Sequence, residues 1–227
     1  RGSGRNRPGG RERGHRGGGL GLMRIGVLVA GGRSTRFGPA EKALATVGGQ
    51  PMLRAVATAL APHVDGLIVN CRREQRASFS AALAGVVPEA RFETDPSPDA
   101  GPVTGALTAL RTTTADHALV VACDQPFLDA GVIASLFEAA DERGAVARAN
   151  GRLEPFGGVY GVESAKEAFE TVVSRGGGSM HEAVSFLAPE IVAMKRAGPF
   201  LSVDTPDDLA AARRGAPRRT EARARGE

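Results

Sequence analysis

Short, nearly continuous runs of apolar residues alternate along the chain with segments whose apolar residues recur every three or four positions. The short runs are bounded by Gly, Asn, Asp or Cys residues, and this arrangement is typical of strands in a sheet that is covered on both faces. Such runs predict strands at 25–29, 66–70 and 117–122, and a shorter strand near 91–93.

The segments with helical spacing predict helices between these strands. Their apolar stripes place helices at 52–60, 74–83, 106–111 and 129–141. The alternation predicts an α/β fold, with a doubly wound, mainly parallel, Rossmann-like sheet and helices on both faces. Ligands bind such sheets at the carboxyl ends of the strands.

Two further patterns complete the expected architecture. Asn150-Gly151 separates apolar stretches at 145–148 and 153–156, and this dipeptide is the strongest short signal for a β-hairpin. Residues 202–209 predict a strand end that runs into a helix beginning at Pro206.

The positive charge lies at the two ends of the chain. The total is +4 for 227 residues, but residues 1–22 hold six Arg against one Glu and residues 211–227 hold six Arg against two Glu, which leaves about −5 for the body between them. Both ends are rich in Gly or Arg and poor in large apolar residues, so we expect disordered tails flanking one folded domain at 23–210. Because the tails have no interleaved aromatic residues, we expect no specific nucleic-acid binding.

Several kinds of site and location are disfavoured. No stretch reaches the roughly 18 consecutive apolar residues of a membrane span. Cys71 and Cys123 lack the spacing of metal ligands and are typical of reduced, buried residues, so we expect a cytoplasmic protein. The four His residues, at 15, 63, 117 and 181, show no partner pattern.

The stretch after the first strand carries the strongest chemical signal. Ala30-Gly31-Gly32 leaves backbone N–H groups bare, and the cations Arg33, Arg36 and Lys42 follow. Bare amides with fixed cations predict a polyphosphate site, whereas the plain alternative is a surface turn with solvated basic residues. The loop matches neither the Walker fingerprint nor the Gly-x-Gly-x-x-Gly pattern, which argues against a P-loop NTPase or a dehydrogenase.

This stretch resembles the signature of the molybdenum cofactor guanylyltransferase family, Leu-Ala-Gly-Gly-x-x-x-Arg-Met-Gly followed by a Lys. The matching residues are Val29, Ala30, Gly31, Gly32, Arg36, Phe37, Gly38 and Lys42. The resemblance implies that the loop wraps a nucleotide triphosphate and that Arg36 and Lys42 contact its phosphates.

The resemblance continues at the ends of later strands. Ile68-Val69-Asn70-Cys71-Arg72-Arg73 is similar to the family's Val-Val-Asn-x-x-Arg, whose Asn contacts the guanine nucleotide. Asp95, followed by Gly101, Pro102 and Gly105, resembles an Asp and a Gly-Pro-Leu-x-Gly segment that lie over the guanosine. By local pattern alone, Asn70 is typical of a turn residue and Asp95 of a solvated loop acid.

Asp124 is the candidate metal ligand. It directly follows a buried strand, and its segment Ala122-Cys123-Asp124-Gln125-Pro126 is similar to the family's Pro-Cys-Asp-x-Pro. A carboxylate there suits a divalent cation that bridges phosphate oxygens, and the resemblance implies Mg²⁺; the plain alternative is a turn cap. Asp204 stands where the family commonly has Asn, and it is a candidate to share this cation.

Three residues are candidates for the acceptor side of the site. Pro155 and Tyr160 resemble a family segment that packs near the acceptor substrate. Arg175, in a Gly-rich stretch between two expected helices, is a candidate contact for an acceptor phosphate.

The resemblance implies an enzyme that transfers GMP from GTP to the terminal phosphate of molybdenum-bound molybdopterin, with Mg²⁺ as cofactor and pyrophosphate as product. Cofactor-biosynthesis proteins or molybdoenzyme chaperones are candidate partners. A CTP-dependent cytidylyltransferase stays open, because Asp124-Gln125-Pro126 also resembles the cytosine-using group, whereas Ala30-Gly31-Gly32 favours GTP. The chain is also compatible with a guanylyltransferase for a different phosphorylated acceptor such as a cobamide precursor, with a nucleotide sensor, and with an RNA-binding module acting through the tails.

Overall fold

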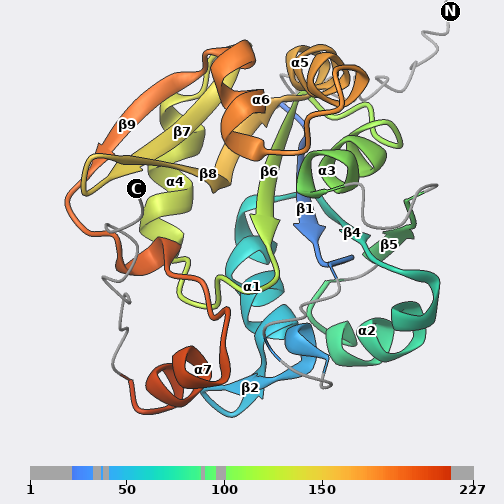
Figure 1. The fold of residues 1–227 in the computed structure, drawn as a ribbon, viewed down its shortest axis with the longest axis vertical. Coiled ribbons are helices and arrows are strands. Elements are labelled where there is room, and N and C mark those ends of the chain that lie inside the picture. The colour runs from blue at the N-terminus through green and yellow to red at the C-terminus, as the bar shows by residue number, and fades with distance from the viewer. Residues whose placement is uncertain (1–21, 33–36, 38–40, 88–89, 96–100, 216–227) are drawn as a thin grey trace, which may run out of the picture.

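A seven-stranded sheet forms the centre of the molecule (Figure 1). The structure is a computed structural model that describes residues 22–32, 37, 41–87, 90–95 and 101–215. The strand order is β5-β4-β1-β6-β8-β7-β9. The strands are β1 Arg24–Val29, β4 Gly66–Asn70, β5 Ala90–Glu93, β6 His117–Ala122, β7 Gly144–Ala149, β8 Arg152–Gly161 and β9 Glu190–Met194.

The sheet is mainly parallel, as its sequence pattern predicts. β1 lies between β4 and β6 and is parallel to both, and β5 is parallel to β4. β8 is antiparallel to both β6 and β7, and β9 is parallel to β7. The carboxyl ends of β1, β4 and β6 therefore meet at one edge of the sheet.

Helices cover both faces of the sheet (Figure 1). One face packs against α1, α2 and α4, and the other against α3, α5 and α6. Alternate residues of β1 pack into the two hydrophobic cores, one on each face of the sheet. Leu28 lies on the first face and Val27 on the second. This double burial explains why the strand sequences are apolar throughout rather than alternating. The helices are α1 Met52–Leu60, α2 Arg76–Leu83, α3 Pro102–Leu110, α4 Ala130–Ala139, α5 Val162–Ser174 and α6 Met180–Leu187.

The predicted hairpin is formed by β7 and β8. Asn150 and Gly151 both have positive φ, at 49° and 76°, as a two-residue turn that matches the twist of the strands requires. β8 extends to Gly161, well past the expected end at residue 156, because its second half pairs with β6.

The C-terminal part of the described chain differs from expectation in three ways. β9 was not predicted, because its residues are largely exposed and it forms an edge through pairing with β7. The strand end expected near residue 202 is wrong: no strand is assigned at 201–205, and Val203 N–H instead donates a single hydrogen bond of 2.9 Å to the carbonyl of Asp124. Helix α7 Pro206–Arg213 begins as predicted but passes the expected domain boundary at 210, because Ala211 and Ala212 are buried.

Short elements near α7 form a small layer below the sheet edge (Figure 1). β2 Thr46–Val47 and β3 Gln50–Pro51 form a separate two-stranded sheet, and α7 packs against β2. Four 3₁₀ turns complete the described structure: η1 Lys42–Leu44, η2 Ala61–His63, η3 Arg73–Gln75 and η4 Gly198–Phe200. Among the described residues, no helix is long and apolar enough to cross a membrane.

Candidate active site

A cavity of about 340 Å³ opens where the carboxyl ends of β1, β4 and β6 meet. Eight of the predicted site residues line it: Val29, Ala30, Gly31, Gly32, Lys42, Asn70, Asp95 and Asp124. The predicted residues Arg33, Arg36 and Gly38 lie outside the described residues. Gly101, Pro102, Ala122, Cys123 and Phe156 complete the lining.

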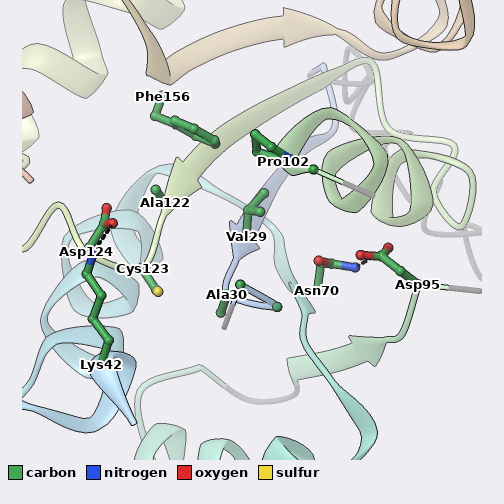
Figure 2. Close-up of a pocket in the computed structure, with 13 residues that line it drawn as sticks. Val29, Ala30, Lys42, Asn70, Asp95, Pro102, Ala122, Cys123, Asp124 and Phe156 are labelled. Atoms are coloured by element: carbon green, nitrogen blue, oxygen red, sulfur yellow. Dashed lines mark hydrogen bonds and ion pairs between the residues drawn. The ribbon is translucent and has the colours of Figure 1, made fainter. Parts of the chain in front are cut away.

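Lys42 and two carboxylates form the charged end of the cavity. Lys42 Nζ lies 2.6 Å from Asp124 Oδ2 and 2.8 Å from Asp204 Oδ1. Figure 2 shows Lys42 and Asp124 facing each other on one side of the site. Asp204 comes from the loop before α7, where Ser202 Oγ donates to its Oδ2 and the Asp208 carboxylate accepts from its backbone N–H. Two segments distant in the sequence thus bring one carboxylate each to the same ammonium group.

The pKa values of these groups are shifted by their surroundings. Burial alone would lower the pKa of Lys42, but the charges and hydrogen bonds of Asp124 and Asp204 outweigh burial and raise it. Burial raises the pKa of Asp124, against the opposing effect of Lys42. Lys42 therefore stays protonated at neutral pH, and the site holds a permanent cation between two acids.

Asn70 and Asp95 form the opposite end of the cavity. Asn70 Nδ2 donates a 2.8 Å hydrogen bond to Asp95 Oδ1, and Asn70 is 1% exposed. Figure 2 shows this pair on the far side of Val29 and Ala30 from Lys42. Its burial and its bond to Asp95 make Asn70 a rigid part of the cavity wall rather than a solvated turn residue.

Glycines make room for this amide. A Cβ at Gly105 would lie 2.5 Å from Asn70 Oδ1, and a Cβ at Gly31 would lie 3.3 Å from the same atom. The first distance is shorter than any real Cβ contact, so only glycine at 105 leaves Asn70 in place. Gly105 therefore belongs to the site although it is not part of the cavity lining.

Phe156 is a lining residue that the sequence pattern does not single out. It comes from β8 and contributes an aromatic wall across from Pro102 (Figure 2). It lies just before residues 158–161, the part of β8 that pairs with β6, and no local pattern reveals that pairing.

The three candidates for the acceptor side have different surroundings. Tyr160 is fully buried in the core, edge-on to Phe169, and its hydroxyl donates to the carbonyl of Pro155. The hydroxyl is therefore committed inside the fold, and the expectation that this segment packs near the acceptor stays a prediction. Arg175 lies with its guanidinium 4.7 Å from the centre of the Phe186 ring and does not line the cavity.

The charged end contains carboxylates, the ligand type that a divalent cation such as Mg²⁺ prefers. No cluster of three or more His, Cys, Asp or Glu side chains with metal-binding geometry occurs among the described residues. The two carboxylates that share Lys42 Nζ nevertheless show that this pair holds positive charge. A hard cation bound there would take its remaining oxygen ligands from phosphate groups and water, as Mg²⁺ commonly does.

Comparison with known proteins gives the family. Residues 26–189 match the model of the MobA-like NTP transferase domain. A probable molybdenum cofactor guanylyltransferase from Natronomonas pharaonis is 41% identical over 197 residues, a match that covers 84% of this chain and 96% of the relative. The chain belongs to the MobA-like NTP transferase family. A molybdenum cofactor guanylyltransferase from Cereibacter sphaeroides matches over the same shares of both chains at 31% identity.

Two solved structures share the fold. Molybdopterin-guanine dinucleotide biosynthesis protein A from Archaeoglobus fulgidus superposes with a TM-score of 0.64 at 23% identity, covering 85% of this chain and 97% of that one. A nucleotidyl transferase from Methanothermobacter gives a TM-score of 0.70 at 20% identity, covering 86% and 98%. Family membership makes the protein a nucleotidyltransferase, and the cavity at the sheet edge is its candidate active site.

Proposed function

We propose that the protein transfers GMP from GTP to the terminal phosphate of molybdenum-bound molybdopterin and releases pyrophosphate. The observation that carries the proposal is one cavity with two chemically distinct ends. Glycine amides with Lys42 and Asp124 suit a triphosphate, and the Asn70–Asp95 pair suits a base. The names of the full-length relatives support the acceptor.

The chemistry needs positioning more than covalent help. The acceptor phosphate attacks the α-phosphorus in line, and it needs no general base because a phosphate is already ionised near neutral pH. Lys42 stabilises the charge that develops on the departing pyrophosphate, together with the loop amides and, from its predicted role, Arg36. Bound Mg²⁺ would neutralise phosphate charge at the same end.

Asp124 and Asp204 are the residues proposed to hold Mg²⁺. They already share a cation, because both accept from Lys42 Nζ, at 2.6 and 2.8 Å. On this proposal Lys42 moves its hydrogen bonds toward phosphate oxygens when the nucleotide and the metal enter. Asp204 supplies a full negative charge at a position where the family commonly has a neutral Asn.

The base end of the cavity favours guanine. The Watson–Crick edge of guanine carries two adjacent N–H groups that match one carboxylate, whereas cytosine presents a single amino donor. Asp95 has such a carboxylate, held in place by Asn70. CTP is the second candidate nucleotide. The cytoplasmic location that the sequence leads us to expect stays a prediction.

The test is acceptor-dependent pyrophosphate release by the full chain with Mg²⁺, comparing GTP, CTP and ATP. The proposal predicts release with GTP at least tenfold faster than with CTP, and none without acceptor. Faster release with CTP would keep the chemistry and overturn the base assignment. Absence of release with all three nucleotides would favour a different acceptor or a nucleotide sensor.

A further inference from the structure

Arg72 lies behind the nucleotide loop rather than in the cavity. It follows β4 by two residues, and its Nη1 donates hydrogen bonds to the carbonyl oxygens of Gly32, at 2.8 Å, and Gly31, at 3.2 Å. Its side chain is 28% exposed and is absent from the cavity lining. One guanidinium thus fixes two successive peptide carbonyls of the loop that follows β1.

The same side chain also reaches the far end of that loop. Arg72 Nη2 lies 3.3 Å from Glu41 Oε2, and the same oxygen accepts from Gln75 Nε2 at 2.9 Å. Gln75 Oε1 in turn accepts from the backbone N–H of Arg72 at 2.8 Å. Glu41 is the residue from which the 3₁₀ turn of Lys42 begins. Arg72 therefore joins the residues before and after positions 33–40.

The hydrogen bonds from Arg72 to the loop carbonyls also fix the direction of the loop N–H groups. A trans peptide points its C=O and its N–H in opposite directions, so a Gly31 carbonyl held by Arg72 turns the Gly32 N–H away from Arg72. Glycines have no side chain to resist rotation of these peptides. Without the guanidinium, either carbonyl oxygen could turn toward the cavity, where it would repel phosphate oxygens.

We propose that Arg72 is a positioning residue for the triphosphate, acting through the peptides of Gly31 and Gly32 and through Glu41 on the backbone of Lys42. The proposal rests on the proposed function, because it assumes that these amides receive phosphate groups. The guanidinium bonds the two loop carbonyls, Glu41 and Glu74, and it does not line the cavity, so on this proposal it acts from behind the loop.

The neighbouring Arg73 provides a matched control. It carries the same side chain one residue further on, at the start of η3, and it is exposed. The family pattern that the sequence resembles has its Arg at this position, whereas the geometry assigns the loop contacts to Arg72. The same substitution at the two positions therefore separates the loop contacts from a general effect of removing positive charge.

The experiment measures the affinity for GTP in the presence of Mg²⁺ by titration calorimetry. The affinity for guanosine is measured by its competition with GTP. We compare the wild-type chain with the variants Arg72→Ala, Arg72→Lys and Arg73→Ala. We expect Arg72→Ala to weaken GTP binding at least tenfold and to leave guanosine binding within twofold, since guanosine has no phosphate. Arg72→Lys should recover part of the loss, because one ammonium can bond one carbonyl but not span the loop. Arg73→Ala should bind both ligands as the wild type does.

Two results would overturn the proposal. Unchanged GTP affinity in Arg72→Ala would show that the loop needs no such support, and equal losses for GTP and guanosine would place the effect outside the phosphate end. If Arg72→Ala does not fold, Glu41→Ala tests the same network from its other end, and it should weaken GTP selectively. Absence of GTP binding by the wild-type chain would instead contradict the proposed function.

Discussion

The central residue of the site is Lys42, which is held between Asp124 and Asp204 at a position 6% exposed. Asp124 is the carboxylate that most needs the ammonium, because burial disfavours its charge, whereas the Asp204 side chain is 46% exposed. The sequence predicts Lys42 as a site residue because it follows the glycine-rich stretch after β1. It predicts Asp124 because this carboxylate follows the buried strand β6. It does not predict their direct ion pair, which depends on residues 82 positions apart.

Lys42→Met should lower kcat/KM for pyrophosphate release by roughly 10²–10³-fold, the effect typical of removing one group that stabilises developing charge. The variant also leaves two carboxylates facing each other, so its melting temperature should fall. Steady-state kinetics with GTP and thermal unfolding measure the two effects. Lys195→Met, at an exposed position just after β9, is the control and should match the wild type in both. Activity of Lys42→Met within fivefold of wild type would contradict the role of Lys42.

Asp204→Asn restores the residue that is usual in the family and removes one negative charge from the cation site. We expect the Mg²⁺ concentration for half-maximal activity to rise several-fold while kcat at saturating Mg²⁺ changes little, because Asp124 remains. A titration of activity with Mg²⁺ measures both quantities. An unchanged Mg²⁺ requirement would show that Asp204 serves only to hold Lys42.

Gly105→Ala tests the space around Asn70. Alanine normally stabilises a helix relative to glycine by about 1 kcal/mol, but here its Cβ would lie 2.5 Å from Asn70 Oδ1. We expect GTP affinity to fall about tenfold as Asn70 is displaced from Asp95, without global unfolding. Gly198→Ala, at the start of η4, is the control, since a Cβ there would meet no atom within 4 Å. Equal GTP affinity in the two variants would remove Gly105 from the site.

Among the elements, those with strong local patterns were predicted best. β4 and β6 have the predicted bounds and β1 begins one residue earlier, because buried parallel strands are apolar throughout. Elements that depend on partners distant in sequence were missed: β9 exists through pairing with β7, and the second half of β8 through pairing with β6. The same limit applies to the site, where strand-end residues were predicted but Phe156 and the loop contacts of Arg72 were not.

Tyr160, in the second half of β8, contacts the first half of the same strand. Its hydroxyl donates to the carbonyl of Pro155 inside the core. Tyr160→Phe leaves that buried acceptor unpaired and should destabilise the fold by ~1–3 kcal/mol. Urea unfolding measures the loss, and the KM for the acceptor should be unchanged because the ring remains. A higher acceptor KM with unaltered stability would contradict this structural role and support a role of Tyr160 near the acceptor.

At the scale of the whole molecule, the parallel order of β4, β1 and β6 creates the site by bringing three strand ends to one edge. The antiparallel β8 then adds Phe156, and the loop before α7 adds Asp204. The two ends of the resulting cavity differ in charge and in hydrogen-bonding groups, and on the proposed function we expect this difference to orient the nucleotide along the cavity. The predicted Arg-rich tails lie mostly outside the described residues, and their role stays a prediction.

The most direct measurement follows label from GTP marked at its α-phosphorus to a molybdopterin acceptor, with the wild-type chain and with Asp124→Asn. We predict that the acceptor becomes labelled in the presence of Mg²⁺, with one pyrophosphate released per label, and that Asp124→Asn reduces the rate at least a hundredfold. Release of labelled GMP to water without labelled acceptor, or an equal rate in Asp124→Asn, would contradict the proposed transfer.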